Sequence, residues 1–145
     1  MTQTQHDDRL IFLIGQARQR LYTKLDQALL NQAGVTTAQA GALFFLTQHD
    51  GCLLLDLSRG LMLDKSAITR MAERLEKKNL IERRPCPQDG RAVRVFLTPS
   101  GRRAASRCLA TAKANNEAIK EGFSETEIRN FSRILQTIIQ RFTEE

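Results

Sequence analysis

The sequence predicts a mainly α-helical fold with one small β-hairpin, and three observations support this prediction. Apolar residues recur at steps of three and four along most of the 145 residues, which is the spacing of amphipathic helices. Two short β-type runs lie close together, at residues 80–84 and 93–97. Only three prolines interrupt the chain. A chain of this length can bury a real core, so we expect residues 1–145 to form a single domain.

The first third of the chain predicts two helices and a turn. Residues 8–33 form a long amphipathic helix that Gly34 ends, with an apolar face of Leu10, Ile14, Ala17, Leu21, Leu25 and Ala28. A second helix begins at a capping box of Thr36 and Gln39 and continues to about Gln48. Its inward residues are Ala40, Leu43, Phe44 and Leu46. Asp50-Gly51 predicts a turn.

The next segment predicts a short helix, a brief turn and a longer helix. The run of residues 53–57 begins a third helix, which ends near Arg59 or Gly60, and Met62-Leu63 forms the turn. Asp64 is a good N-cap for a fourth helix that runs to Lys78. Asn79 follows where a residue that tolerates left-handed dihedral angles is needed. On a helical wheel one side of this helix is apolar, with Ile68, Met71, Ala72 and Leu75.

The remaining segments predict a hairpin and two helices. The strands at 80–84 and 93–97 are joined by residues 85–90, which are rich in turn formers, so Arg91 lies at the tip of a protruding basic hairpin that we call the wing. Thr98 caps a fifth helix that begins with Pro99 and ends near Glu121. Ser124 and Glu127 form a capping box for the last helix. Its apolar residues follow heptad spacing: Ile128, Phe131, Leu135, Ile138 and Phe142.

The positive charge is concentrated in one third of the chain. Residues 59–107 contain 13 Lys and Arg against 5 Asp and Glu, whereas the rest has 9 basic and 11 acidic residues. A surface that binds a polyanion requires such a concentration, although a solvated helix face would also show it. The fourth helix adds a pattern to this charge, because opposite its apolar side it carries Ser66, Arg70, Glu73, Arg74 and Lys77, with Thr69 at the edge.

This polar face suits the major groove of duplex DNA. Short hydroxyls near the start of a helix can approach base edges, arginine can reach guanine O6 and N7, and lysines farther along meet phosphates. The third helix, the turn and the fourth helix therefore predict a helix-turn-helix. With the hairpin added, the predicted architecture is a winged helix-turn-helix.

The stretch from Asp56 to Gly101 closely resembles the MarR family of multiple-antibiotic-resistance-type regulators. The resemblance rests on the wing pattern Asp89-x-Arg91, followed by Leu97-Thr98 and Gly101. The order and length of the flanking helices extend it to nearly the whole chain. This chain differs in having Met62 near the usual turn glycine, Asn79 where glycine is commoner, and Leu55 where a polar cap is usual.

The resemblance implies a homodimer with dimerisation helices at about 8–33 and 99–143 and a DNA-binding winged helix at about 36–98. It also implies that Ser66, Thr69 and Arg70 read the major groove. Arg91 would enter the minor groove or grip its phosphates, and Asp89 would orient Arg91 or brace the wing. We also expect Arg74 and Lys77 of the fourth helix, and Arg94 of the hairpin, to be among the DNA-binding residues.

Several of these residues also have a structural interpretation. Ser66 could cap the first helical turn and Thr69 could be half-buried, while Asp89 and Arg91 could form a surface ion pair. Arg83, Arg84 and Arg94 could bind phosphates or be solvated charges.

The cysteines and one small polar cluster invite further interpretations. The three cysteines are an odd number without a C-x-x-C pair, which favours reduced thiols in the cytoplasm. Cys108 looks like a small buried apolar residue, and Cys86 is the cysteine whose basic surroundings could lower its pKa. His49, Asp50 and Cys52 could be metal ligands, but an ordinary turn suits them better. We expect no cofactor and no metal.

The sequence predicts a cytoplasmic regulator that binds a pseudo-palindromic operator in double-stranded DNA as a homodimer. The resemblance to the MarR family further implies that it is a repressor and that a small molecule releases it. The expected partners are duplex DNA, a second copy of the chain and a small-molecule effector. No apolar run is long enough to cross a membrane, and residues 1–8 lack the apolar stretch of a signal peptide. The chain shows no catalytic constellation, which argues against an enzyme. The alternative is a winged helix that docks proteins or binds RNA without recognising an operator.

Overall fold

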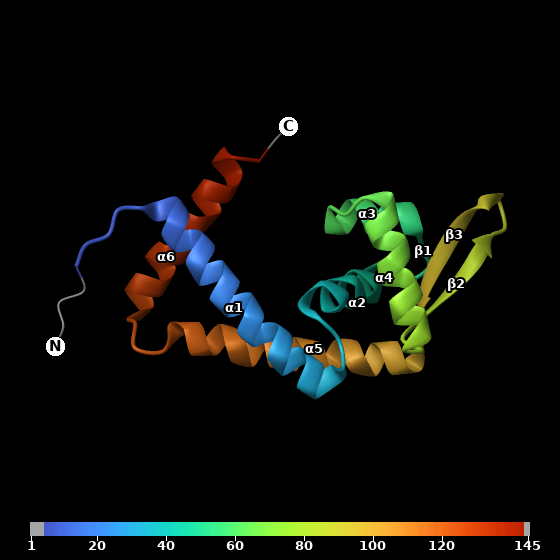
Figure 1. Ribbon diagram of the computed structural model, residues 1–145, viewed down its shortest axis with the longest axis horizontal. Helices are drawn as coiled ribbons and strands as arrows, with labels where there is room; N and C mark the ends of the chain where they lie inside the picture. Colours follow the sequence, from blue (N-terminus) through green and yellow to red (C-terminus); the bar gives the residue numbers. More distant parts are fainter. Residues whose placement is uncertain (1–4, 144–145) are drawn as a thin grey trace. The chain divides into compact units, whose positions relative to one another are not determined.

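The computed structural model describes residues 5–143, which form six helices and a three-stranded sheet (Figure 1). In chain order the elements are α1 (Leu10–Ala33), α2 (Thr37–Gln48), β1 (Cys52–Leu53), α3 (Leu54–Leu61), α4 (Lys65–Lys77), β2 (Ile81–Cys86), β3 (Asp89–Leu97), α5 (Pro99–Lys120) and α6 (Glu125–Arg141). The chain divides into two compact units, and the boundary lies between Thr111 and Ala112 within α5. The mainly helical fold with a β-hairpin wing is as predicted.

The helix starts follow the local capping signals. The Thr36 hydroxyl accepts a hydrogen bond from the Gln39 amide, and the Gln39 side chain accepts one from the Thr36 amide, both at 3.2 Å. Ser124 and Glu127 form the same reciprocal pair before α6. These contacts join residues three apart, so sequence spacing is enough to predict them. Some helix ends differ from the predicted ones by two residues or fewer, since α1 begins at Leu10, α3 spans Leu54–Leu61, α4 ends at Lys77 and α5 ends at Lys120.

Two non-glycine residues adopt the left-handed conformation, one after each helix of the helix-turn-helix. Met62 follows α3 with φ 56°, and Asn79 follows α4 with φ 60°. Asn79 was predicted to do so. Met62 takes the place of a glycine at some conformational cost, because a side chain with a Cβ is strained at positive φ. The turn between α3 and α4 therefore contains a left-handed residue that is not glycine.

The sheet is larger than the sequence predicts. β3 is the central strand and pairs antiparallel with both β1 and β2. The two-residue strand β1 was missed, because two residues are too few to show alternation. The connection at 85–90 was also predicted too long: β2 extends through Pro85 and Cys86, and β3 begins at Asp89. Pro85 is tolerated because β2 is an edge strand with a register shift between Pro85 and Cys86.

One apolar core holds the first unit together. Buried residues of α1, α2, α3, α4, the sheet and the start of α5 form a single cluster, which includes Leu29, Leu43, Leu57, Leu75, Val95 and Cys108. The predicted inner face of α4 is confirmed, because Ile68, Ala72 and Leu75 are buried and Met71 is half-buried. The apolar side of α4 is thus held against the core, and its polar side faces outward.

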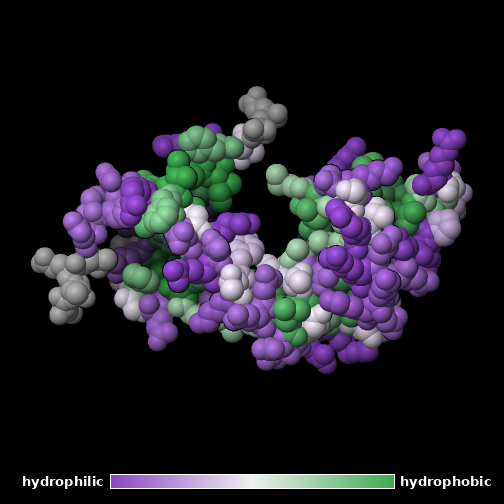
Figure 2. Space-filling model, in the orientation of Figure 1, coloured by the Kyte–Doolittle hydropathy of each residue, from purple (hydrophilic) through white to green (hydrophobic). Residues whose placement is uncertain are grey.

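Both ends of the chain expose apolar side chains. Every residue from Leu10 to Lys24 in α1 is exposed, although this stretch carries most of the predicted apolar face. In the second unit no described residue is buried, and Phe131 and Ile139 of α6 are 52% and 66% exposed. Figure 2 shows these apolar surfaces in green. A single chain therefore leaves both faces in contact with water, at a substantial cost in free energy.

Candidate nucleic-acid interface

The exposed face of α4 is the centre of the candidate interface. Asp64 caps the helix, because its Oδ1 accepts a hydrogen bond from the Ala67 amide at 2.8 Å. That bond lowers the pKa of the Asp64 carboxyl, so the cap stays ionised at neutral pH. Beyond the cap, Ser66, Arg70, Arg74 and Lys77 are exposed and Thr69 is half-buried. Figure 2 shows hydrophilic side chains gathered over α4.

The first two turns of α4 form a shallow concavity. It is lined by Lys65, Ser66, Thr69 and Arg70. The Ser66 hydroxyl donates to Asp64 Oδ1 at 3.0 Å, and the Thr69 hydroxyl donates to the Lys65 carbonyl at 2.8 Å. Each hydroxyl uses its proton in these bonds, and its oxygen can still accept a hydrogen bond. Lys65 was missed as a site residue, although it follows the cap directly and lies one turn before Thr69.

The wing presents Arg91 near its tip. Asp89 Oδ1 accepts a hydrogen bond from the Arg91 amide at 3.0 Å, so the Asp89 carboxylate braces the backbone beside Arg91. The Arg91 side chain is exposed. Its position differs from the predicted loop, since Arg91 belongs to β3 and the turn consists of Pro87 and Gln88. Arg91 lies between Asp89, which pairs with Cys86, and Val93, which pairs with Pro85, where the strand register shifts.

Three other arginines of the basic segment have partners within the protein. Arg83 forms an ion pair with Glu76 at 3.0 Å, and its amide also donates to Glu76. Arg84 pairs with Glu82 at 3.0 Å and lies over the Phe96 ring. Arg94 is half-buried and donates to the Gly51 carbonyl at 2.9 Å. These arginines are therefore neither simple solvated charges nor wholly available to a ligand.

The turn after α2 fastens the wing to α5. Asp50 Oδ1 accepts from the Leu97 amide at 2.8 Å, and Oδ2 accepts from Arg102 at 2.7 Å. Gly51 adopts φ 80° and donates its amide to Val95. The turn predicted at Asp50-Gly51 is confirmed. Across residues 5–143, no group of three His, Cys, Asp or Glu side chains is placed to hold a metal ion.

The cysteines have contrasting environments. Cys108 is buried in the core as predicted, and burial raises its pKa. Cys86 is also buried, yet its pKa is lowered, chiefly by hydrogen bonding to the Gln88 amide and to a smaller extent by the Asp89 amide and Arg94. The predicted direction is confirmed, but the main cause is the backbone of the hairpin turn rather than the basic charge.

Comparison with known proteins matches the winged-helix region to a family. The model of the MarR family matches residues 35–93, which include α2 to α4, β2 and half of β3. The multiple antibiotic resistance protein MarR of Salmonella typhimurium is 36% identical over 101 residues, which are 69% of this chain and 67% of that protein. Within the described residues, no helix is long and apolar enough to cross a membrane.

Solved structures extend the likeness to nearly the full chain. A probable transcriptional regulator from Pseudomonas aeruginosa is 32% identical with a TM-score of 0.78, over 92% of this chain and 98% of that one. PcaV from Streptomyces coelicolor, solved in complex with its natural ligand, shares the fold at 22% identity and a TM-score of 0.75, over 92% and 93% of the two chains. Since the shared region carries the capped basic helix and the wing, and since a relative is matched over two thirds of its length, this chain belongs to the MarR family of transcriptional regulators.

Proposed function

We propose that α4 enters the major groove of a specific operator, with Ser66, Thr69 and Arg70 against base edges. The observation that carries this proposal is the concavity at the start of α4, where two hydroxyls and two cations surround the exposed first turns of a helix that is buried on its other side. Arginine can form a bidentate pair with guanine, and the two hydroxyls offer acceptors to amino groups of adenine or cytosine.

The remaining residues would hold the protein on the backbone of the duplex. Arg74 and Lys77 follow on the same exposed face and would meet phosphates. Arg91 would reach the adjacent minor groove or its phosphates from the wing, with Asp89 bracing the backbone beside it. Arg94 would contribute through the guanidinium N–H groups that do not bond to Gly51.

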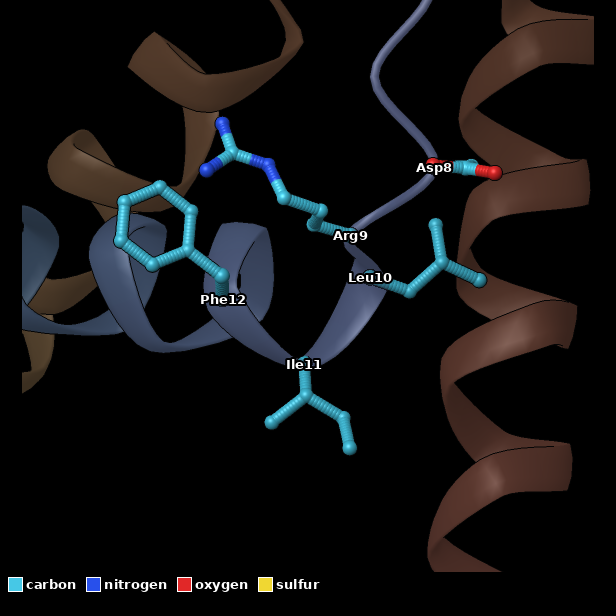
Figure 3. A pocket seen from close by; sticks show the side chains of 5 residues that line it. All are labelled: Asp8, Arg9, Leu10, Ile11 and Phe12. Atoms are coloured by element: carbon cyan, nitrogen blue, oxygen red, sulfur yellow. The ribbon is translucent and has the colours of Figure 1, made fainter.

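The regulator would act as a homodimer on a pseudo-palindromic operator. Its interface would involve α1, α5 and α6, each of which exposes apolar side chains in the single chain, such as Ile11, Leu109 and Phe131. The first turn of α1 illustrates this: Leu10, Ile11 and Phe12 project in three directions, and Ile11 is 90% exposed (Figure 3). Two-fold symmetry would present two recognition helices to half-sites about 34–36 Å apart.

A small-molecule effector would release the protein from its operator in the cytoplasm. Support comes from PcaV, a protein of the same fold that was solved with its natural ligand. An effector need only prefer a dimer geometry that misplaces the two recognition helices. Because a bound dimer would exclude polymerase from an overlapping promoter, the direction we propose is repression.

The proposal is tested by selecting bound duplexes from a random pool and measuring their affinity by gel shift. We expect one inverted-repeat motif to be enriched and to bind about 10³-fold or more tightly than random duplex. Single-stranded RNA of the same sequence should bind no better than random duplex. Retention of RNA in preference to duplex, or selection of no motif, would contradict the proposal and favour an RNA-binding or protein-docking winged helix.

A further inference from the structure

The side chain of Lys78 joins the end of α4 to the corner between α1 and α2. Its Nζ donates one hydrogen bond to the Gly34 carbonyl and one to Gln39 Oε1, both at 2.8 Å. These acceptors are 44 and 39 residues away along the chain. The contact therefore links the recognition helix to the helix that we propose to be part of the dimer interface.

The corner that receives Lys78 is already ordered by its own hydrogen bonds. Gly34 adopts φ 68° and donates its amide to the Leu30 carbonyl at 3.1 Å. Gln39 is only 6% exposed, and its Oε1 also accepts from the Thr36 amide. Asp26 of α1 accepts from the Thr37 amide at 2.6 Å. The two acceptors are thus already ordered, so no further conformational entropy of the corner is lost when Lys78 binds to them.

The electrostatics of the corner also favour a cation. Both α1 and α4 end here, and the Gly34 carbonyl lies just beyond the last turn of α1. Lys78 is itself the C-cap of α4, with its amide bonded to the Arg74 carbonyl at 3.1 Å. The C-terminal end of a helix carries partial negative charge, so the end of α1 stabilises the Lys78 ammonium that donates to the Gly34 carbonyl.

Apolar packing alone fixes the position of a helix less sharply than hydrogen bonds do. The buried side of α4 is aliphatic, and apolar contacts are not directional, whereas hydrogen bonds constrain both distance and angle. We infer that Lys78 is a positioning residue that sets the recognition helix relative to α1. In the proposed dimer it thereby sets the distance between the two recognition helices. The inference rests on the proposed function for that last step.

Comparison with the neighbouring Lys77 distinguishes a positioning lysine from a phosphate-binding one. Lys77 and Lys78 carry the same charge, and Lys77 belongs to the exposed face proposed to meet phosphate. The side chain of Lys78 is turned to the α1–α2 corner by its two hydrogen bonds. A phosphate-binding lysine changes affinity alike on every duplex, whereas a positioning lysine changes the preferred geometry of the duplex.

The test measures how affinity depends on half-site spacing. The probe is a duplex that the wild-type protein selects from a random pool, with one base pair inserted or deleted at its centre, which moves the half-sites by about 3.4 Å. Lys78→Met keeps the aliphatic stem and removes the ammonium. We expect it to bind the selected duplex about 5- to 20-fold more weakly, as is usual for coupling between sites, and to lose most of the preference for the original spacing. Lys78→Arg should restore both, because a guanidinium can donate to two carbonyl oxygens.

Lys77→Met is the matched comparison, since it removes the same charge from the neighbouring exposed residue of α4. It should weaken binding about equally at every spacing and so keep the spacing preference. If Lys78→Met instead weakens binding equally at every spacing, Lys78 is a phosphate contact and the inference is wrong.

A measurement without DNA separates the inference from the proposed function. In Lys78→Met, the Gly34 carbonyl and Gln39 Oε1 lose a hydrogen-bond donor, so amide hydrogen exchange should become faster at Gly34 and Gln39. Exchange at both amides should be unchanged in Lys77→Met. Unchanged exchange at both amides in Lys78→Met would overturn the inference. If exchange becomes faster but the wild type selects no duplex, then the proposed function fails while the link between α4 and α1 stands.

Discussion

Gly101 shows how a single atom can decide the packing between two elements. It lies in the first turn of α5, where a Cβ would overlap the backbone carbonyl of Leu80. That carbonyl also accepts a hydrogen bond from the Thr98 amide at 3.1 Å, so it cannot move freely. We predict that Gly101→Ala lowers the free energy of unfolding by about 1–3 kcal/mol, as overpacking does.

Thermal or urea unfolding measures this effect, with Gly90→Ala as the control. A Cβ at Gly90 would meet nothing within 4 Å, so we expect little change in its stability. Equal stability of the two variants would mean that α5 can shift away from Leu80 without loss. The sequence shows Gly101 as part of the family pattern, but the steric reason for glycine comes from the packing of α5 against Leu80, just before β2.

Arg70 and Arg91 should contribute to binding in different ways. Arg70 lines the concavity of α4, so Arg70→Ala should cost about 1–3 kcal/mol on the selected operator and much less on random duplex. Arg91→Ala should weaken binding by a similar factor on many sequences and lower the salt slope by about one per site. The ratio of specific to non-specific affinity distinguishes them. The opposite pattern would mean that Arg91 reads the sequence and Arg70 holds the backbone.

The residue types at the interface could be predicted, but many of their partners could not. Helical spacing is enough to place Arg70 opposite the buried Leu75, because both lie on one helix. Arg94 donates to the Gly51 carbonyl, 43 residues away, and Lys78 donates to the Gly34 carbonyl, 44 residues away. Contacts of this kind depend on how whole elements pack, which a local pattern does not contain.

Among the elements, the pair Glu76 and Arg83 ties the recognition helix to the wing. The Arg83 side chain lowers the pKa of Glu76 below its ordinary value of 4.5. A carboxyl with a lowered pKa in the folded state stabilises the fold at neutral pH, and this contribution is lost as the pH falls through the folded pKa. The side chains of Arg83 and Glu76 are 28% and 39% exposed, so the ion pair contributes at most about 1 kcal/mol to the free energy of unfolding.

We therefore predict that Glu76→Gln is less stable than the wild type at pH 7 and that the difference shrinks below about pH 4.5. Melting temperatures across this pH range measure it. Glu82→Gln is the control, because Glu82 and Arg84 are more than half exposed and lie two residues apart on the same strand. A difference between wild type and Glu76→Gln that grows towards low pH would contradict the assignment of the ion pair.

Helix α6 should be required for assembly rather than for the winged helix itself. Its described residues include none that is buried, and its apolar positions follow heptad spacing. Deletion of residues 124–145 should give a monomeric or insoluble protein that no longer binds a duplex with two half-sites. Sedimentation and gel shift test this. A truncated chain that remains soluble, dimeric and active would place the interface elsewhere.

Element boundaries divide into those that local chemistry decides and those that pairing decides. The capping residues Thr36, Asp64 and Ser124 begin their helices as predicted, because each bonds to an amide three residues away. Strand β1 and the outer ends of β2 and β3 exist only through their hydrogen bonds to another strand. Turn formers such as Pro85 and Gly90 therefore predicted a longer loop than the sheet contains.

At the scale of the whole molecule, the uneven charge predicts how binding responds to salt. Residues 59–107 carry 13 cationic against 5 acidic side chains, and a dimer would present this segment twice. Some of these cations are engaged within the protein, including Arg83 and Arg102, and so contribute less to phosphate neutralisation. We therefore predict about 6–10 phosphate contacts per dimer, with a slope of about −5 to −9 for log affinity against log salt concentration.

Gel shifts on the selected duplex over about 50–200 mM salt measure this slope, since the release of condensed counterions dominates in that range. The matched comparison is between Arg74→Ala and Arg102→Ala. Arg74 is exposed on α4, so its loss should make the slope shallower by about one per site. Arg102 is paired with Asp50, so its loss should leave the slope nearly unchanged while it loosens the turn behind the wing. A slope that is flat for the wild type would remove the electrostatic basis of the interface, whereas equal changes in both variants would mean that the Arg102 ion pair opens when DNA binds.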